Sequence, residues 1–479
     1  MAQPFAEPCA AGLIKAAPPL HAPELTSGRR RWLLAACVLA SSLVFIDGSA
    51  LTVALPALRA SFDADLASVQ WVLNGYVLAL AALTLVGGAL ADVYGNARVL
   101  CVSCLAFAIA SVACAFAPSV PWLIVLRVVQ GIAAAVLAPA SLAFIGAIYP
   151  DDERSRAIGV WASASALTTA GGPVLGGWLT ETAGWQWVFA INPPLALVAV
   201  GLILAVAPAD RPQPRPFDVV GAVILAVGLG ALAWALSQIS GTDSAGRAGA
   251  DGISIAAAAA LALAAIVAYA RWERATAHPM TPPRLLANKL FVSLNAATLL
   301  LYVGLAAMFF LLSFDLVDRR RLSPTDAGLA FLPFTLGVGL LSRPFGAAAD
   351  KFGAGTMLIT GSVGAALGYG ALALGTNASL LIGVLAPLIL LGVSFAVLVA
   401  PLTAAVLSSL DQADEGLASG VNNAMSRIAQ LAGIALAAGL APNSFGYQTC
   451  LAAAAVAAVA AAVVVYMRMP PRPTASAPA

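Results

Sequence analysis

The sequence contains few charged residues and almost no histidine. Asp, Glu, Lys and Arg make up only 10% of its 479 residues, whereas a soluble domain carries about a quarter. The two histidines, His21 and His278, lie outside the apolar runs, which argues against a metal site or a histidine proton relay. The six cysteines are scattered and give no disulfide framework. Because no basic cluster occurs either, we expect no enzyme active site, no metal, no cofactor and no nucleic-acid partner.

Hydrophobic residues, by contrast, make up 61% of the chain, and its mean hydropathy is +0.93. These values predict an all-α polytopic membrane protein. A helix needs about 20 residues to cross roughly 30 Å of hydrocarbon. By this measure we expect fourteen spans, near residues 32–58, 69–91, 99–117, 121–148, 157–180, 186–207, 217–240, 252–272, 290–314, 326–345, 355–375, 378–407, 417–440 and 447–467.

The distribution of arginine and lysine predicts the orientation of these spans. An even number of spans places both termini on the same side of the membrane. Three arginines at 29–31 precede the first span, and Arg468 and Arg472 follow the last. Loops on the cytoplasmic side are enriched in Lys and Arg, so we expect both termini to be cytoplasmic, in a multi-pass protein of the cell membrane. The arginine run at 319–321 disagrees, because it falls in a loop on the opposite side.

Two short segments indicate an internal repeat. The segment GGALADVYG at 87–95 and the segment FGAAADKFG at 345–353 both read G-A-x-A-D-x-[YF]-G, each after an even-numbered span. Related halves in parallel orientation, with six spans each, leave two spans between them. The domains expected from this division are a disordered cytoplasmic N-terminus (1–28), an N-terminal six-helix bundle (29–208), a linker with two extra spans (209–284), a C-terminal six-helix bundle (285–468) and a cytoplasmic tail (469–479).

Several motifs follow one another along the chain. They are DGSALTVALP (47–56), GALADVYGNAR (88–98), RVVQGIAAA (127–135), GGPVLGG (171–177) and GWQWVFAINPP (184–194), with LSPTDAGLAFLP (322–333) and GLASGVNNAMSRIAQLAG (416–433) in the second half. These motifs resemble those of the fourteen-span drug:proton antiporter family of the major facilitator superfamily, which exports drugs and quaternary ammonium compounds. Val93, Asn96 and Gln186 depart from the residues usual in that family.

The resemblance implies a monomeric major facilitator fold and the export of small amphiphilic or hydrophobic compounds, such as drugs, antibiotics or toxic metabolites. It implies alternating access driven by a proton gradient, without a cofactor, and with lipid, protons and the substrate as partners. Two alternatives remain: a proton-coupled symporter or exporter of one specific metabolite on the same fold, and a non-transporting membrane receptor.

Asp47 is the residue whose position most requires a functional explanation. It lies about midway along an apolar run, where a carboxylate costs roughly 2.5–3.5 kcal/mol on insertion scales. Arg127 and Gln130 lie three residues apart in another span and therefore share a helix face. We predict that Asp47 carries the coupled proton and that Arg127, with Gln130, tunes it. The alternative is a purely structural acid.

Three further groups of residues are expected to act in transport. The two repeated turns predict a cytoplasmic gate, unless they only make tight turns. The Gly-Pro run predicts a kinked, dry seam between the halves, unless it only packs tightly. Scattered polar residues are candidates for the substrate cavity, unless they only bond helices together. The gate residues are Gly88, Asp92, Gly95, Arg98, Gly346, Asp350, Lys351 and Gly353; the kink residues are Gly172, Pro173, Gly176 and Gly177; the cavity candidates are Asn74, Tyr76, Trp161, Asn192, Asn295, Asn423 and Arg427.

Overall fold

The computed structural model describes residues 26–208, 218–238, 252–277, 279, 281, 283–410, 415–440 and 444–469. The predictions made for 1–25, for the start of the linker and for the tail beyond 469 lie outside these residues. The described residues form helices and connecting turns, with no strand among them. This agrees with the all-α fold expected from the sequence.

The first bundle and the hairpin that follows it occupy the N-terminal part of the described chain. The bundle comprises α1 (Ser27–Phe62), α2 (Leu66–Tyr94), α3 (Asn96–Ala115), α4 (Val120–Ile148), α5 (Asp151–Thr182), α6 (Gln186–Ala190) and α7 (Asn192–Val206), and the hairpin comprises α8 (Val219–Ser237) and α9 (Gly252–Ala275).

The second bundle contains more interrupted helices. Its elements are α10 (Pro283–Ala287), α11 (Lys289–Phe314), the π-helix η3 (Asp315–Arg319), α12 (Pro324–Ala330), α13 (Leu332–Phe352), α14 (Ala354–Leu374), the 3₁₀-helix η4 (Gly375–Asn377), the π-helix η5 (Leu381–Leu385), α15 (Ala386–Ser408), α16 (Glu415–Leu440) and α17 (Ser444–Arg468).

Within the described residues, twelve helical segments are long and apolar enough to cross a membrane, judged by length and composition. The expected spans 157–180 and 417–440 are not among them, although both segments form long helices, α5 and α16. These two helices pack against α1 and α11 inside the bundles. The expectation of fourteen spans therefore remains a prediction.

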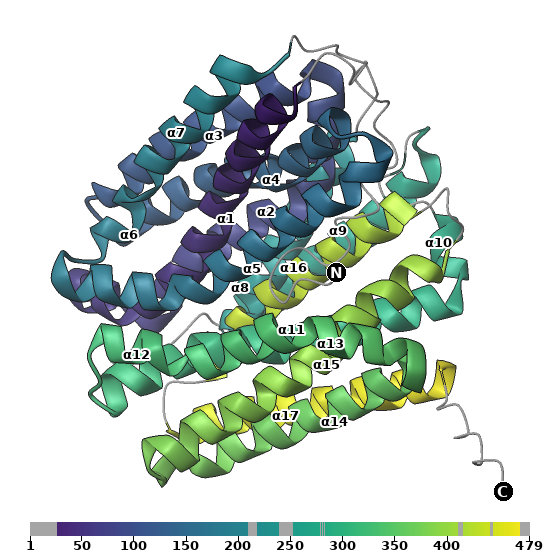
Figure 1. Ribbon diagram of the computed structural model, residues 1–479. Coiled ribbons are helices and arrows are strands. Elements are labelled where there is room, and N and C mark those ends of the chain that lie inside the picture. Colours follow the sequence, from purple (N-terminus) through teal and green to yellow (C-terminus); the bar gives the residue numbers. More distant parts are fainter. Residues whose placement is uncertain are drawn as a thin grey trace, which may run out of the picture.

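The two bundles repeat the same packing pattern (Figure 1). In the first, α1 packs on α5 and α7, α2 on α4, and α3 on α4 and α7; in the second, α11 packs on α16 and α17, α13 on α15, and α14 on α15 and α17. The repeated turns also match in conformation. Gly95 ends α2 at φ 96° and ψ 137°, and Gly353 ends α13 at φ 85° and ψ 139°. Only glycine adopts such a positive φ without strain, which explains why both turns carry it.

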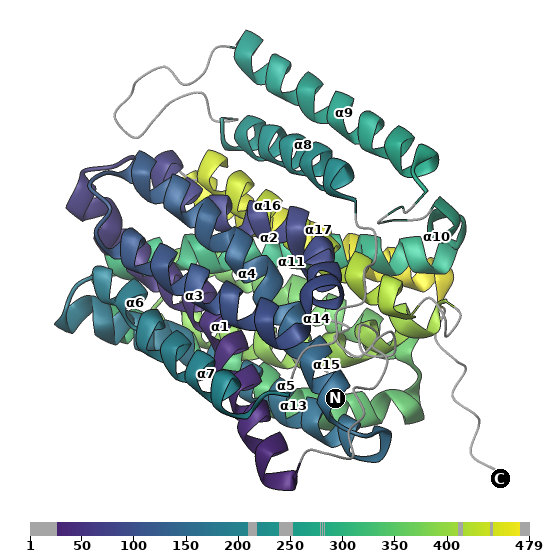
Figure 2. The same ribbon diagram turned by 90° about the horizontal axis from the view of Figure 1, so that it is seen from above.

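The α8–α9 hairpin lies beside the two bundles (Figure 2). Helix α8 contacts α2 of the first bundle and α16 of the second, and α9 packs on α8 at the outside. The hairpin therefore covers one of the two lines along which the bundles meet.

Contacts inside the protein account for most of the arginine run that disagreed with the charge rule. Asp315 is only 6% exposed and accepts hydrogen bonds from Arg319 and, at 2.9 Å, from Arg320. Arg320 also donates to the carbonyls of Gly375, Thr376 and Ala378. At least two of the three charges thus tie a turn to its neighbours.

Helices α1 and α5 approach so closely at Gly176 that a side chain has no space. A Cβ at this position would overlap the carbonyl oxygen of Ala50, whereas a Cβ at Gly171 on the same helix would meet nothing within 4 Å. We predict that Gly176→Ala lowers the free energy of unfolding of the purified protein by about 1–3 kcal/mol, the usual cost of overpacking, and therefore lowers its melting temperature. Gly171→Ala is the matched control. Equal melting temperatures for the two variants in detergent would contradict this close packing.

Candidate functional site

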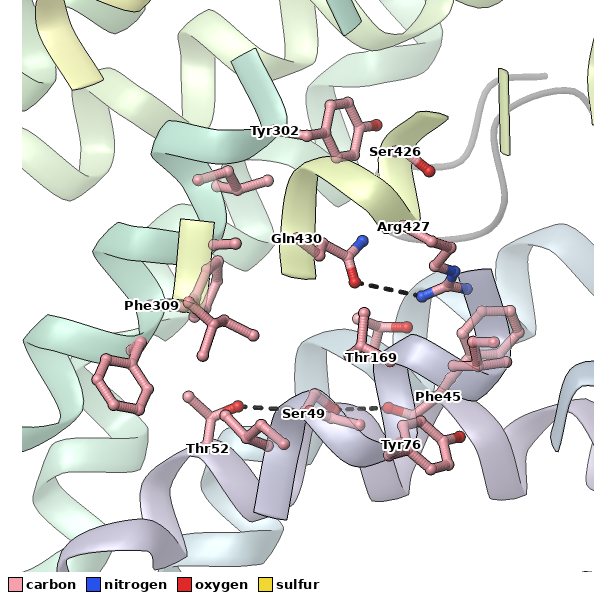
Figure 3. A pocket seen from close by; sticks show the side chains of 18 of the residues that line it. Phe45, Ser49, Thr52, Tyr76, Thr169, Tyr302, Phe309, Ser426, Arg427 and Gln430 are labelled. Carbon is pink, nitrogen blue, oxygen red and sulfur yellow. Dashed lines mark hydrogen bonds between the residues drawn. The ribbon is translucent and has the colours of Figure 1, made fainter. Parts of the chain in front are cut away.

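A cavity of ≈ 160 Å³ lies between the two bundles. Helices α1, α2, α4 and α5 form one side, and α11, α13 and α16 form the other. Figure 3 shows aromatic and polar side chains from both bundles facing this space. The described aromatic lining residues are Phe45, Tyr76, Tyr302, Phe309 and Phe310, and the polar ones are Ser49, Thr52, Arg127, Thr169, Thr335, Ser426, Arg427 and Gln430.

A buried ion pair lies behind the wall of this cavity. Arg127 on α4 donates to Asp47 on α1, with Nη1 2.5 Å from Oδ2, and both side chains are 0% exposed. The same nitrogen lies 2.6 Å from Oε1 of Gln130, and Nε of Arg127 donates to the carbonyl of Val72 at 3.1 Å. The structure thus brings together the three residues predicted for proton coupling. Several hydrogen bonds offset the large penalty for burying two charges.

Two more polar side chains complete the surroundings of Asp47. Oδ1 of Asp47 accepts from Gln130 at 3.1 Å and from Asn192 at 3.2 Å. Ser111 accepts from the same two amides and donates to the carbonyl of Phe189 at 2.9 Å. Asn192 was expected in the cavity, but here it holds the carboxylate from the side facing α7. Sequence reasoning missed Ser111, although a hydroxyl in the apolar run 99–117 was a usable signal.

Arg127 separates Asp47 from the cavity. Arg127 is among the residues that line the cavity and its guanidinium stacks 4.1 Å from the ring centroid of Tyr76, whereas Asp47 is not among the described lining residues. The stack is a cation–π contact, which is strongest where water is excluded. Among the described residues, Nη2 of Arg127 has no hydrogen-bond partner. A proton or a ligand that enters the cavity therefore meets Arg127 before Asp47.

Only two of the seven cavity candidates, Tyr76 and Arg427, are among the lining residues in this conformation. Trp161 donates instead to Ser41 at 2.7 Å inside the first bundle. Asn295 accepts from Asn422 at 3.1 Å between α11 and α16.

Asn74 and Asn423, two further candidates, are buried. Neither side chain has a hydrogen-bond partner among the described residues. Most of the candidates are therefore buried between helices and do not line the cavity.

The Gly-Pro run takes part in two different contacts. Gly172 and Gly176 face α1, where a Cβ would overlap Ser49 and Ala50. Gly177 faces the other bundle, where a Cβ would overlap the carbonyl oxygen of Pro324 at the start of α12. In return, a Cβ at Gly328 of α12 would overlap the carbonyl oxygen of Pro173. This reciprocal contact, which we call the glycine seam (Gly177 with Pro324, and Gly328 with Pro173), joins the two bundles.

Polar contacts join the bundles close to the glycine seam. The backbone N–H of Thr325 donates to Glu181 at 3.1 Å, and Arg59 forms an ion pair with Asp318 at 3.5 Å. Glu181 lies one residue beyond the expected span 157–180. Hydrogen bonds from Thr325 and Ser323 lower the pKa of its carboxyl, because they favour the charged form. At this end of the molecule, shown where α5 meets α12 in Figure 1, the bundles are in contact.

The predicted cytoplasmic gate can be described only in part. Gly95 and Gly353 end their helices as noted above, and a Cβ at Gly346 would lie 3.1 Å from that of Ala400. Arg98 is exposed, and Lys351 lies over the ring of Phe352, with 5.4 Å between Nζ and the centroid. The side chains of Asp92 and Asp350, with Gly88, lie outside the described part. The gate therefore remains a prediction.

Comparison with known proteins decides the family. A sequence profile of the Major Facilitator Superfamily matches residues 37–317 and 294–479, which is most of the chain. The chain belongs to the major facilitator superfamily. Solved structures of other transporters share the fold: the match to a peptide transporter, POT, covers 95% of this chain and 97% of that protein, with a TM-score of 0.70 and 15% identity. The xylose transporter XylE from E. coli covers 93% and 99%, with a TM-score of 0.62 and 16% identity. At these identities, the likeness shows the fold alone.

Curated relatives within the superfamily are more similar in sequence. A multidrug resistance protein B homolog of Mycobacterium tuberculosis is 34% identical over 340 residues, which are 71% of this chain and 62% of the relative. A lincomycin resistance protein of Streptomyces lincolnensis is 32% identical over 87% of this chain and 85% of the relative. A tetracenomycin C resistance and export protein of Streptomyces glaucescens is 34% identical over 71% and 63%. The match thus spans less than two thirds of the first and third relatives. Membership makes this chain a multi-pass membrane protein of a transporter superfamily.

Proposed function

We propose that this protein exports small amphiphilic or hydrophobic compounds in exchange for protons, by alternating access. The observation that carries the proposal is the fully buried ion pair of Asp47 and Arg127 at the wall of a central cavity. An ionisable group inside a membrane protein marks a transport or proton pathway by default. The names of the relatives, which include multidrug resistance and antibiotic export, support the same direction of transport.

The ion pair supplies a mechanism for coupling. An arginine guanidinium does not release its proton in proteins, so we assign the binding and release of the proton to Asp47. Protonation removes the negative charge and weakens the attraction to Arg127, which frees the guanidinium that now lies between Asp47 and the cavity. A proton moving down a membrane potential of ~150 mV yields about 3.4 kcal/mol. That energy supports an accumulation ratio of about three-hundredfold for a neutral substrate.

The contacts between the bundles indicate which conformation of the transport cycle this structure represents. With both termini in the cytoplasm of a cell-membrane protein, the glycine seam and the Glu181–Thr325 contact lie at the outer side. They hold that side closed, and we infer that the cavity exchanges its contents with the cytoplasm in this state. Rocking of the two bundles would then open the seam and expose the cavity to the outside. We propose that the protein does this as a monomer in the lipid bilayer.

Transport into inverted membrane vesicles tests the proposal. With an acidic interior, a proton antiporter accumulates its substrate inside such vesicles, whereas a proton symporter with the same fold releases it. A panel of aromatic dyes and antibiotics serves as candidate substrates, and vesicles without the protein serve as the control. Accumulation that collapses with a protonophore supports the proposal. Binding without flux would indicate a receptor instead, and release down the proton gradient would indicate a symporter.

A further inference from the structure

The described wall of the cavity carries positive charge only. Two lining residues, Arg127 and Arg427, are cations, and no Asp or Glu is among the described residues that line the space. Asp47 balances the charge of Arg127 from behind the wall. Arg427 projects from α16 into the cavity from the second bundle, with Nη1 3.4 Å from Oε1 of Gln430 on the same helix (Figure 3). The potential in the cavity therefore favours electron-rich groups and disfavours cations.

The hydroxyl groups that line the cavity already donate their hydrogens to backbone carbonyls. Ser49 donates to the carbonyl of Phe45 at 2.7 Å, and Thr169 donates to that of Ser165 at 2.8 Å. Ser426 donates to the carbonyl of Asn423 at 2.8 Å, and Thr52 and Thr335 likewise donate to carbonyls of their own helices. A hydroxyl has one hydrogen but two lone pairs. These five side chains therefore offer acceptors to a ligand, and the guanidinium of Arg427 offers donors.

Aromatic side chains line the cavity between these polar groups. Phe45, Tyr76, Tyr302, Phe309 and Phe310 come from α1, α2 and α11 and line the cavity from both bundles. Such rings favour a flat aromatic ligand, which they contact by stacking or edge-to-face packing. Shape and polarity thus select the same kind of molecule: an aromatic body with hydroxyls as donors and a carbonyl or carboxylate as acceptor.

We propose that the substrate is a hydroxylated aromatic compound with a carbonyl or carboxylate group, and that permanent cations are poor substrates. The carbonyl or carboxylate oxygen accepts from Arg427, the ligand's hydroxyls donate to the Ser and Thr oxygens, and its rings pack between Tyr76 and Phe309. The proposal rests on the proposed transport function and specifies what that function acts on. It departs from the quaternary ammonium compounds that the sequence motifs implied.

Two dyes with the same three-ring xanthene body test the selectivity. Fluorescein carries phenolic oxygens and a carboxylate, whereas rhodamine 123 carries a permanent cation and an esterified carboxyl. Fluorescence anisotropy with the purified full-length protein at neutral pH gives the Kd of each. We expect fluorescein to bind at least about tenfold more tightly, since a hydrogen bond to a charged group is worth about tenfold to hundredfold in affinity. Equal binding, tighter binding of rhodamine 123, or binding of neither dye would overturn the proposal.

Substitution of Arg427 locates the effect. Arg427→Gln should weaken fluorescein binding about tenfold to hundredfold and leave rhodamine 123 unchanged or tighter. Arg427→Lys keeps the charge and should retain the preference, which guards against a folding defect in the glutamine variant. Arg343→Gln removes an exposed arginine of α13 outside the cavity and should change neither Kd. Equal weakening of both dyes in Arg427→Gln would contradict a role in selectivity.

The same dyes separate this proposal from the proposed function. In proteoliposomes with an imposed pH gradient, selective binding without proton-driven flux of any compound would overturn the transport function and leave the binding site standing. Proton-driven flux of rhodamine 123, with equal affinity for the two dyes, would support transport and overturn the selectivity.

Discussion

Asp47→Asn is expected to abolish proton-driven accumulation of substrate, a loss of about a hundredfold or more in the gradient that the protein sustains. Asparagine has nearly the same shape and keeps one oxygen, which can accept from Arg127 or from the amides of Gln130 and Asn192, the donors that now bond the two carboxylate oxygens. It cannot bind and release a proton. The cavity and the rocking motion remain, so exchange of substrate down its own gradient should persist while its dependence on the proton gradient disappears.

The measurement compares two kinds of flux in proteoliposomes. Proton-driven uptake reports coupling, and counterflow of labelled substrate without a proton gradient reports binding and conformational change. Asp65→Asn is the matched control, because Asp65 caps α2 by accepting from Ser68 at 2.7 Å and asparagine caps helices equally well. Proton-driven uptake by Asp47→Asn at the rate of the unsubstituted protein would refute the coupling role of this residue. Loss of counterflow as well would indicate a structural acid, the alternative considered above.

The second large effect is expected at the glycine seam. Gly177→Val would place three carbon atoms where the carbonyl of Pro324 now lies, so α5 and α12 cannot meet as they do here. Overpacking of this kind costs about 1–3 kcal/mol or more, which shifts a two-state equilibrium by about fivefold to more than a hundredfold. The variant should therefore favour the state open at the seam, and proton-driven transport should fall by at least about tenfold because the cycle stalls.

Distances between spin labels at Ala183 and Leu329, both exposed near the seam, measure this shift directly. The labels are placed in a variant without native cysteines. We expect the short distance to be lost in Gly177→Val and, because the contact is reciprocal, in Gly328→Val. Gly201→Val makes the same change on α7, where a Cβ would meet nothing within 4 Å, and should leave the distances unchanged. An unchanged distribution in both seam variants would mean that the glycines pack the helices without controlling the opening.

Much of the fold follows from local sequence properties. Apolar runs of about 20 residues predicted the positions of the long helices, and the G-A-x-A-D-x-[YF]-G repeat predicted two equivalent turns. The interruptions were not predictable: the span expected at 326–345 is divided into α12 and α13, and that expected at 378–407 begins with a π-helix. Hydropathy averages over a window, so it does not detect a change of helix type that depends on neighbouring helices.

The candidate site divides in the same way. A carboxylate and a guanidinium in apolar runs are so unfavourable alone that the sequence by itself pointed to the pair of Asp47 and Arg127. The tertiary structure decided that Asn192 and Ser111 join this pair, and that Gly177 meets α12 rather than α1.

The tertiary structure also decided which side chains line the cavity. Phe309, Thr335 and Arg427 reach the cavity from three helices of the second bundle. A charged side chain inside a membrane carries a free-energy penalty, so a single charged residue in an apolar run can be recognised from the sequence alone. The direction in which a neutral or aromatic side chain points depends instead on how helices distant in the sequence are rotated against each other, and no local pattern records that.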